Sequence, residues 1–229
     1  MRIFATGDAE RTEELKLKLA IETFPRDFKM NFDAFSNYDV IFDLNADDNS
    51  PFVPNHYAGL ENKLVIVCAV KNSLTSMISS APSALKCDLV GMNTLPTFIN
   101  RSKLEVSFPN EKSRNAFSAF ADEMKLEFLE VEDRVGMVTP RVICMIINEA
   151  CYSLQEGVAT LEDIDKAMKL GTNYPFGPFE WCDRMGVKEV YETLEAIQND
   201  TNDERYRISE LLKEKYLKEE TFYPMQRSF

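Results

Sequence analysis

Residues 63–69 have the sequence KLVIVCA, an uninterrupted apolar run. Apolar runs without strict alternation are typical of strands that are buried on both faces, as in a parallel sheet covered by helices. Two similar runs occur at residues 38–42 (YDVIF) and 87–92 (CDLVGM), and the first of these is bounded by Asn and Asp. We predict that all three runs form buried strands.

Helical segments separate these runs. Residues 2–5 (RIFA) are short and apolar and lead into a stretch with Leu15 and Leu19 on one helical face. Residues 73–80 predict a short helix. Strands alternating with helices over about 130 residues favour an α/β domain with a mostly parallel sheet. A smaller βαβ-like unit completes it, formed by residues 104–108, 110–124 and 126–131.

From about residue 136 the pattern becomes purely helical. Thr139-Pro140 is a favourable helix start, because a capping residue precedes a proline at the first helical position. Thr160 and Asp163 resemble a capping box that opens a second helix. Further expected elements are a turn at 173–178 and helices at 187–199 and 204–218. We therefore predict an α/β domain over residues 1–133 and an all-helical domain over residues 134–229.

The charge of the chain restricts its partners. Lys and Arg number 26 and Asp and Glu 38, giving a formal net charge of −12. Non-specific nucleic-acid binding needs a basic surface, so we expect no nucleic-acid partner. The sequence has no apolar run of about 18 residues, and its first residues become polar too early for a secretory signal. We expect a cytoplasmic protein without a membrane span.

The cysteines and the histidine argue against a metal site. The five cysteines show no CxxC spacing, and Cys144 and Cys151 are spaced to share a helix face among apolar neighbours. The chain has one histidine, His56, in a proline-flanked loop, where a surface role is expected. We predict buried free thiols and no bound metal.

Several blocks of the helical half carry a family resemblance. In order they are residues 148–150 (NEA), 156–159 (EGVA), 163–171 (DIDKAMKLG), 175–180 (PFGPFE) and 183–186 (DRMG). Their order and spacing resemble the C-terminal domain of 3-hydroxyacyl-CoA dehydrogenases over some 85 residues. The resemblance implies a helical domain of the 6-phosphogluconate/3-hydroxyacyl-CoA dehydrogenase C-terminal type. It also implies a homodimer formed through this domain.

A fainter resemblance extends into the first half. Residues 91–96 (GMNTLP) are similar to the family's Gly-Leu-His-Phe-Phe-Asn-Pro segment, and 104–106 (LEV) to its following Val-Glu-Val strand. Residues 72–74 (NSL) resemble its Ser-Ser-Leu turn, and 2–7 the first strand of its dinucleotide-binding domain. The resemblance implies a reduced Rossmann-like domain, NAD as cofactor, an acyl-CoA ligand and a place in fatty-acid metabolism.

The resemblance also assigns site positions. Asn93 and Glu105 occupy the places of the catalytic histidine and the glutamate that orients it. An amide has no proton that titrates near neutral pH and cannot act as a base, although it can still form hydrogen bonds. Without an imidazole partner, Glu105 is left to pair with a cation or to face solvent. Substrate-site positions fall on Ser73, Pro140 and Arg141, with Pro140 replacing an asparagine.

The cofactor position is altered as well. A dinucleotide fingerprint uses closely spaced glycines so that the backbone can approach the pyrophosphate. Here Gly7 is alone and is followed by Asp8 and Glu10, whose carboxylates repel a diphosphate. NAD is therefore implied by the resemblance, whereas the residues argue against binding in the family manner.

Three hypotheses remain open at this stage. The favoured one is a 3-hydroxyacyl-CoA dehydrogenase-like protein that has lost hydride transfer and keeps a binding or dimer-scaffold role. The second is an active NAD-dependent oxidoreductase that acts on a 3-hydroxyacyl-CoA or a small hydroxy acid with a rearranged site. The third is a subunit that supports an active relative by heterodimerising through its helical face.

Overall fold

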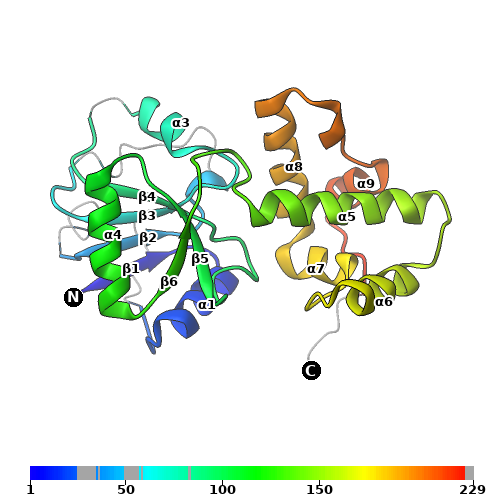
Figure 1. The fold of residues 1–229 in the computed structure, drawn as a ribbon, viewed down its shortest axis with the longest axis horizontal. Helices are drawn as coiled ribbons and strands as arrows, with labels where there is room; N and C mark the ends of the chain where they lie inside the picture. Colours follow the sequence, from blue (N-terminus) through cyan, green and yellow to red (C-terminus); the bar gives the residue numbers. More distant parts are fainter. Residues whose placement is uncertain (25–34, 36, 49–56, 58, 82–83, 225–229) are drawn as a thin grey trace. The chain divides into compact units, whose positions relative to one another are not determined.

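The computed structural model describes residues 1–24, 35, 37–48, 57, 59–81 and 84–224. The chain divides into two compact units, Met1–Met137 and Val138–Phe229. The first unit contains a β-sheet with helices around it, and the regular structure of the second is helical (Figure 1). The predicted fold class, an α/β unit followed by a helical unit, is confirmed.

The sheet of the first unit has six strands that follow one another in chain order. Strands β1 to β4 are parallel, β4 and β5 are antiparallel, and β5 and β6 are parallel again. The prediction of a mostly parallel sheet is confirmed. The antiparallel step arises because the chain returns from β4 to β5 without a crossover helix, which a parallel neighbour would require. The strands are β1 (Ile3–Thr6), β2 (Val40–Asp43), β3 (Leu64–Cys68), β4 (Asp88–Met92), β5 (Lys103–Ser107) and β6 (Glu127–Glu130).

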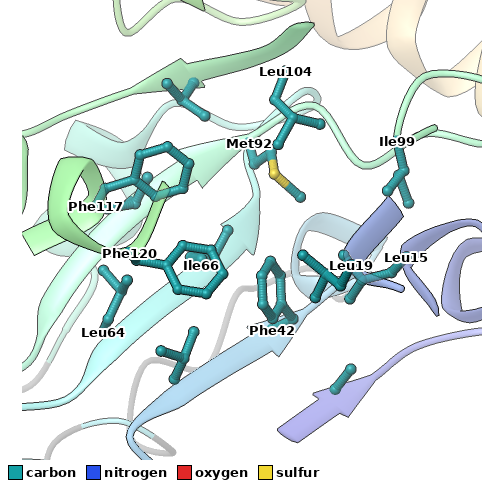
Figure 2. Packing of buried hydrophobic residues seen from close by; sticks show 14 of the residues in the cluster. Leu15, Leu19, Phe42, Leu64, Ile66, Met92, Ile99, Leu104, Phe117 and Phe120 are labelled. Atoms are coloured by element: carbon teal, nitrogen blue, oxygen red, sulfur yellow. The ribbon is translucent and has the colours of Figure 1, made fainter. Parts of the chain in front are cut away.

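Both faces of the central strands are buried, which explains the uninterrupted apolar runs. On one face, Phe42 and Ile66 pack with side chains of α1 (Ala9–Leu19) and α4 (Glu111–Met124). Figure 2 shows Phe42 beside Phe120 of α4, and the centroids of the two rings are 5.9 Å apart. The opposite face includes Ile41 and Val65, which are also fully buried. A third helix, α3 (Leu74–Ser79), follows β3.

In the second unit, α5 (Thr139–Gln155) packs against the other helices. These are α6 (Leu161–Thr172), α7 (Pro178–Met185), α8 (Val187–Thr201) and α9 (Glu210–Lys218). Thr160 is the N-cap of α6, at the expected helix start, since its Oγ1 accepts a hydrogen bond from the backbone N–H of Asp163 at 3.2 Å. Across the described residues, no helix has the length and hydropathy needed to cross a bilayer.

Two predicted boundaries in the helical unit are wrong. The expected turn at 173–178 gives way at Pro178 to α7, for which the sequence analysis predicted no helix. The expected helix at 204–218 is interrupted: a 3₁₀ turn, η3 (Glu204–Tyr206), precedes α9. Buried Asn148 explains the interruption, because its amide donates to the carbonyl of Arg207 and accepts from the N–H of Ser209, both at 2.9 Å.

The cysteines behave as predicted. All five are free and buried. Burial raises the pKa of the Cys151 thiol to about 12 and that of Cys87 to about 11. The thiolate is the reactive form, so these thiols are unreactive near neutral pH.

Candidate functional site

Asn93 and Glu105 are brought together by the antiparallel pairing of β4 and β5. The register sets Met92 opposite Val106, and the N–H of Asn93 donates to the carbonyl of Glu105 at 3.0 Å. Their side chains also meet, with Asn93 Nδ2 3.4 Å from Glu105 Oε2. The expected spacing therefore corresponds to a direct contact between the two side chains.

The Asn93 amide is held by its surroundings. Its Oδ1 accepts from the N–H of Leu95 at 3.3 Å, while its Nδ2 donates to the Glu105 carboxylate. The residue is 3% exposed and Glu105 is 9% exposed. The alternative in which Glu105 faces solvent is therefore wrong. A buried carboxylate with an amide donor can hold a polar group in place, but the pair lacks an imidazole that could exchange a proton with a substrate hydroxyl.

The single glycine of the first turn lies between β1 and α1, as the sequence analysis expects for the cofactor position. A Cβ added at Gly7 would lie 2.8 Å from Leu44 Cβ and 2.9 Å from Asn45 Oδ1. Gly7 also has φ +156°. The glycine thus permits close contact with the chain's own residues Leu44 and Asn45, which follow β2.

A cluster of charged side chains, most of them buried, lies beside this turn, and no sequence pattern predicted it. Arg11 of α1 is 0% exposed. Its Nε is 3.1 Å from Asp8 Oδ2 and its Nη2 is 3.4 Å from Asp48 Oδ2. Asp48 also pairs with Lys71 Nζ at 2.6 Å. We refer to Asp8, Arg11, Asp48 and Lys71 as the ion cluster.

The cations of the ion cluster favour the ionised form of the Asp48 carboxylate. Burial raises the pKa of Asp48, but Arg11 and Lys71 lower it by more, so its pKa lies below the ordinary value. The neighbouring Asp47 carboxylate accepts the backbone N–H groups of Val70 and Lys71 at 2.8 and 2.7 Å. The carboxyl ends of β2 and β3 are therefore joined by the protein's own charges.

The chemistry of this turn does not fit a dinucleotide. In a doubly wound dinucleotide-binding sheet the first strand lies inside the sheet, bordered on both sides by other strands. Here β1 lies at the edge, and the described residues contain no strand beyond it to carry a ribose-binding acid. The N-terminus of α1, which would face the pyrophosphate, is capped by Asp8 Oδ1, 2.9 Å from the Arg11 N–H. The residues present therefore do not fit NAD in the family manner.

The remaining predicted positions serve local structure. Ser73 caps α3, its Oγ accepting from the N–H of Ser76 at 3.2 Å. Pro140 is buried in the first turn of α5. Arg141 Nη1 donates to the Tyr206 hydroxyl at 2.8 Å, and its guanidinium lies over the Tyr206 ring. Ser73 belongs to the first unit, together with Asn93 and Glu105. Pro140 and Arg141 belong to the second unit.

An open cavity of about 1090 Å³ lies in the second unit, between α6, α7 and the residues after α9. Two of the aspartates that line it hold the local structure. Asp165 caps α7 through the N–H groups of Phe179 and Glu180, at 2.8 and 2.9 Å, and accepts the Tyr223 hydroxyl at 2.9 Å. Asp183 accepts the N–H of Tyr223 at 2.8 Å. These two aspartates therefore serve the local structure of the cavity wall.

The other expectations concern metal and histidine. The described part of the chain contains no group of three or more His, Cys, Asp or Glu side chains that could hold a metal ion. His56 lies outside the described residues.

The sequence analysis could have found only part of the ion cluster. Asp8 and Arg11 are three residues apart at a helix start, where a capping carboxylate and a basic residue can meet. Asp48 and Lys71 come from separate segments that only the sheet brings together. No local pattern indicates that contact.

Comparisons with known proteins agree with this fold. Residues 136–225 match the family model of the 3-hydroxyacyl-CoA dehydrogenase C-terminal domain. The chain is 40% identical over 111 residues to the 3-hydroxyadipyl-CoA dehydrogenase of Escherichia coli K12, covering 48% of this chain and 23% of that protein. It is 35% identical over 127 residues to a probable 3-hydroxybutyryl-CoA dehydrogenase of Bacillus subtilis, covering 56% of this chain and 44% of that protein. The chain therefore spans less than half the length of either relative.

Solved structures share the fold at lower identity. The (S)-3-hydroxybutyryl-CoA dehydrogenase of Ralstonia eutropha aligns with a TM-score of 0.68 at 24% identity, over 82% of this chain and 69% of that one. FadB2 of M. tuberculosis aligns with a TM-score of 0.77 at 14% identity, over 95% of this chain and 94% of that one. These similarities concern the fold. The family model and the related sequences show that residues 136–225 form a C-terminal domain of the 3-hydroxyacyl-CoA dehydrogenase family.

Proposed function

We propose that this chain is a 3-hydroxyacyl-CoA dehydrogenase-like protein of fatty-acid metabolism that does not carry out hydride transfer. It instead keeps a ligand-binding or dimer-scaffold role in the cytoplasm. The proposal treats residues 1–133 as a degenerate dinucleotide-binding domain and residues 134–229 as the family's helical domain.

The observation that carries the proposal is the state of Asn93. The hydroxyl proton of a 3-hydroxyacyl-CoA needs an acceptor whose pKa lies near neutral pH, and a neutral amide is not such an acceptor. The Asn93 amide is buried and hydrogen-bonded to Glu105 and Leu95, which holds it in a fixed orientation. An amide can form a hydrogen bond with a carbonyl or hydroxyl group, but it cannot accept the hydroxyl proton of the substrate.

The proposal of an acyl-CoA ligand and of a homodimer is based on the resemblance to the family. The helical unit exposes large apolar side chains, including Val158 and Leu170 at 70% and 78% exposure. Apolar side chains on the surface are compatible with self-association, although single exposed residues are common. We propose a homodimer formed through this unit. Sedimentation velocity over a hundredfold concentration range tests it, and a monomer throughout would contradict it.

Hydride transfer is tested with acetoacetyl-CoA and NADH, following NADH absorbance in the presence of the full chain. We expect the rate to equal that of a blank without protein. The Glu105→Gln variant is the matched control, because it keeps the shape of the side chain and removes the charge. Turnover that is proportional to protein concentration and vanishes in Glu105→Gln would contradict the proposal.

Ligand binding is tested separately, by thermal shift with CoA and acetoacetyl-CoA. A ligand at a hundredfold excess over its dissociation constant stabilises the folded state by about 2.7 kcal/mol. For a chain of this length we expect Tm to rise by about 5–10 °C. A shift with acetoacetyl-CoA but not with NADH is the expected result for a binding protein of this kind.

The second candidate, an active oxidoreductase with a rearranged site, is favoured by one observation. Glu105 is a buried carboxylate in contact with Asn93, at the spacing that the family uses for its catalytic pair. A carboxylate within hydrogen-bond reach of a substrate proton can act as a general base. The Glu105→Gln control described above separates this candidate from the first.

A further inference from the structure

We propose that the Asp8 carboxylate, held by Arg11, takes the place of a dinucleotide phosphate at the N-terminus of α1, so that this turn binds no dinucleotide. The inference rests on the proposed function for the identity of the missing ligand. It concerns the cofactor turn, whereas the proposed function concerns the reacting centre at Asn93.

The donors that would face a phosphate are already used. The N–H groups at a helix N-terminus bind anions because they point outward and carry the positive end of the helix dipole. In α1 the N–H of Arg11 donates to Asp8 Oδ1 at 2.9 Å. The N–H of Asp8 itself donates to Asn45 Oδ1 at 2.8 Å. The Asp8 carboxylate therefore occupies the position of a bound anion at the helix N-terminus. The N–H of Asp8 is already bonded to the side-chain oxygen of Asn45.

The charges of the turn are balanced within the protein. Arg11 faces Asp8 and Asp48, and Lys71 faces Asp48, so two cations meet two carboxylates. Lys71 is 8% exposed. The buried Asp47 carboxylate adds a further negative charge beside them. A diphosphate would have to displace Asp8 from Arg11 and would then face uncompensated carboxylates.

The space over the glycine is filled too. Leu44 and Asn45 lie against Gly7, within 3 Å of the position where a Cβ would stand. The Leu44 carbonyl is fixed by two donors, Arg11 Nη1 and the Thr94 hydroxyl, the latter at 2.8 Å. The Asn45 amide also donates to Asp8 Oδ2 at 3.1 Å. The close approach that a fingerprint glycine normally offers to a pyrophosphate is here taken by the segment after β2.

The first test is a fluorescence titration of the wild-type full chain with NADH. We expect no saturable signal up to about 1 mM, the upper end of ordinary enzyme–substrate affinities. Saturable binding with a dissociation constant below that limit would overturn the inference.

The second test uses the Asp8→Ala variant, with Glu13→Ala as the matched control. Glu13 is an exposed carboxylate of the same helix and lies outside the ion cluster. Loss of a capping carboxylate is expected to lower Tm by about 2–4 °C in a chain of this length. Glu13→Ala is expected to change it by less than about 1 °C.

Inorganic pyrophosphate at constant ionic strength completes the test. In Asp8→Ala the helix terminus and Arg11 are uncovered, so we expect pyrophosphate to restore part of the lost Tm. Wild type and Glu13→Ala should show no shift. A shift in wild type, no difference between the two variants, or no rescue of Asp8→Ala would each contradict the inference.

These outcomes are distinguishable from failure of the proposed function. NADH binding without turnover would overturn this inference and leave the proposed loss of hydride transfer standing. NADH binding with turnover of acetoacetyl-CoA would overturn both.

Discussion

The two units of the chain use carboxylates at helix N-termini in different ways. In the second unit, Asp165 caps α7 from another helix, and Gly177 leaves room for it, because a Cβ there would stand 2.3 Å from Asp165 Cγ. These residues belong to the blocks that carry the family resemblance. In the first unit, the helix terminus that would face a cofactor is covered by Asp8, beside the ion cluster.

Some residues of a family motif stabilise the fold, and others take part in the reaction. Where motif residues hold helices together, as Asn148 and Asp165 do, removing them exposes unsatisfied buried groups. Where motif residues serve a reaction, as at position 93, another polar residue can fit the same place. The fold of the family can therefore persist in a chain that does not perform its reaction.

The largest expected effect is in the ion cluster. Arg11→Met would leave Asp8 without its cation and Asp48 with Lys71 alone, and should lower the free energy of unfolding by about 3–5 kcal/mol. Arg2→Met is the control and should cost less than about 1 kcal/mol, because this side chain is exposed and its Nη2 is 4.0 Å from Asp39 Oδ1. Urea denaturation followed by circular dichroism measures both. Equal costs would show that the cluster does not hold the first unit.

The helical unit provides the counterpart. Asp165→Ala removes the acceptor of two backbone N–H groups and one hydroxyl, and should cost about 2–4 kcal/mol. Glu162→Ala, an exposed position of the same helix, should lie within about 0.5 kcal/mol of wild type. A small cost for Asp165→Ala would contradict the structural role that we assign to the motif.

A smaller loss of stability is expected for a change at Asn148, another motif residue that holds the helical unit together. Asn148→Ala loses the hydrogen bonds to Arg207 and Ser209 and should cost about 2 kcal/mol. Hydrogen exchange should show the loss at the N–H of Ser209 and the start of α9. Protection of those amides equal to wild type would show that Asn148 does not fix this segment.

The smallest effects concern pH and have opposite signs in the two units. The folded pKa of Asp48 is lowered, so its stabilisation is present above the unfolded value of about 3.9 and is lost as pH falls through the lower folded value. Burial raises the pKa of Asp183 by more than the N–H groups of Phe222 and Tyr223 lower it. Its ionisation therefore weakens the fold, and protonation as pH falls through the raised folded pKa relieves that cost.

Asn variants at the two aspartates test these signs by thermal denaturation between about pH 3 and pH 7. Asp48→Asn should flatten the loss of stability in acid. Asp183→Asn should remove a gain of stability on mild acidification. The same change in both variants would contradict the opposite assignments.

Much of the fold could be predicted from the sequence, because the strands are apolar on both faces and the helices have capping signals. The start of α7 was missed although Gly177 and Pro178 are the N-cap and the first helical residue, a recognised helix start. The antiparallel β4–β5 pair could not be inferred from apolar runs, which do not encode direction. The break before α9 depends on Asn148, some 60 residues away in the chain.

The candidate site was predictable only in part. The spacing from Asn93 to Glu105 indicated a pair, and the two side chains are 3.4 Å apart. No local pattern indicates that Glu105 is buried, since burial depends on the packing of the whole sheet. Arg11, Asp48 and Lys71 come from three segments, and only the folded sheet shows that they meet.

The central claim is that this chain does not transfer hydride, and a single-turnover experiment tests it most directly. The full chain, in excess over NADH, is mixed with acetoacetyl-CoA, and absorbance is followed for hours. The account predicts that NADH disappears no faster than in the blank. Loss of NADH that matches the formation of 3-hydroxybutyryl-CoA, and that is absent in Glu105→Gln, would contradict it.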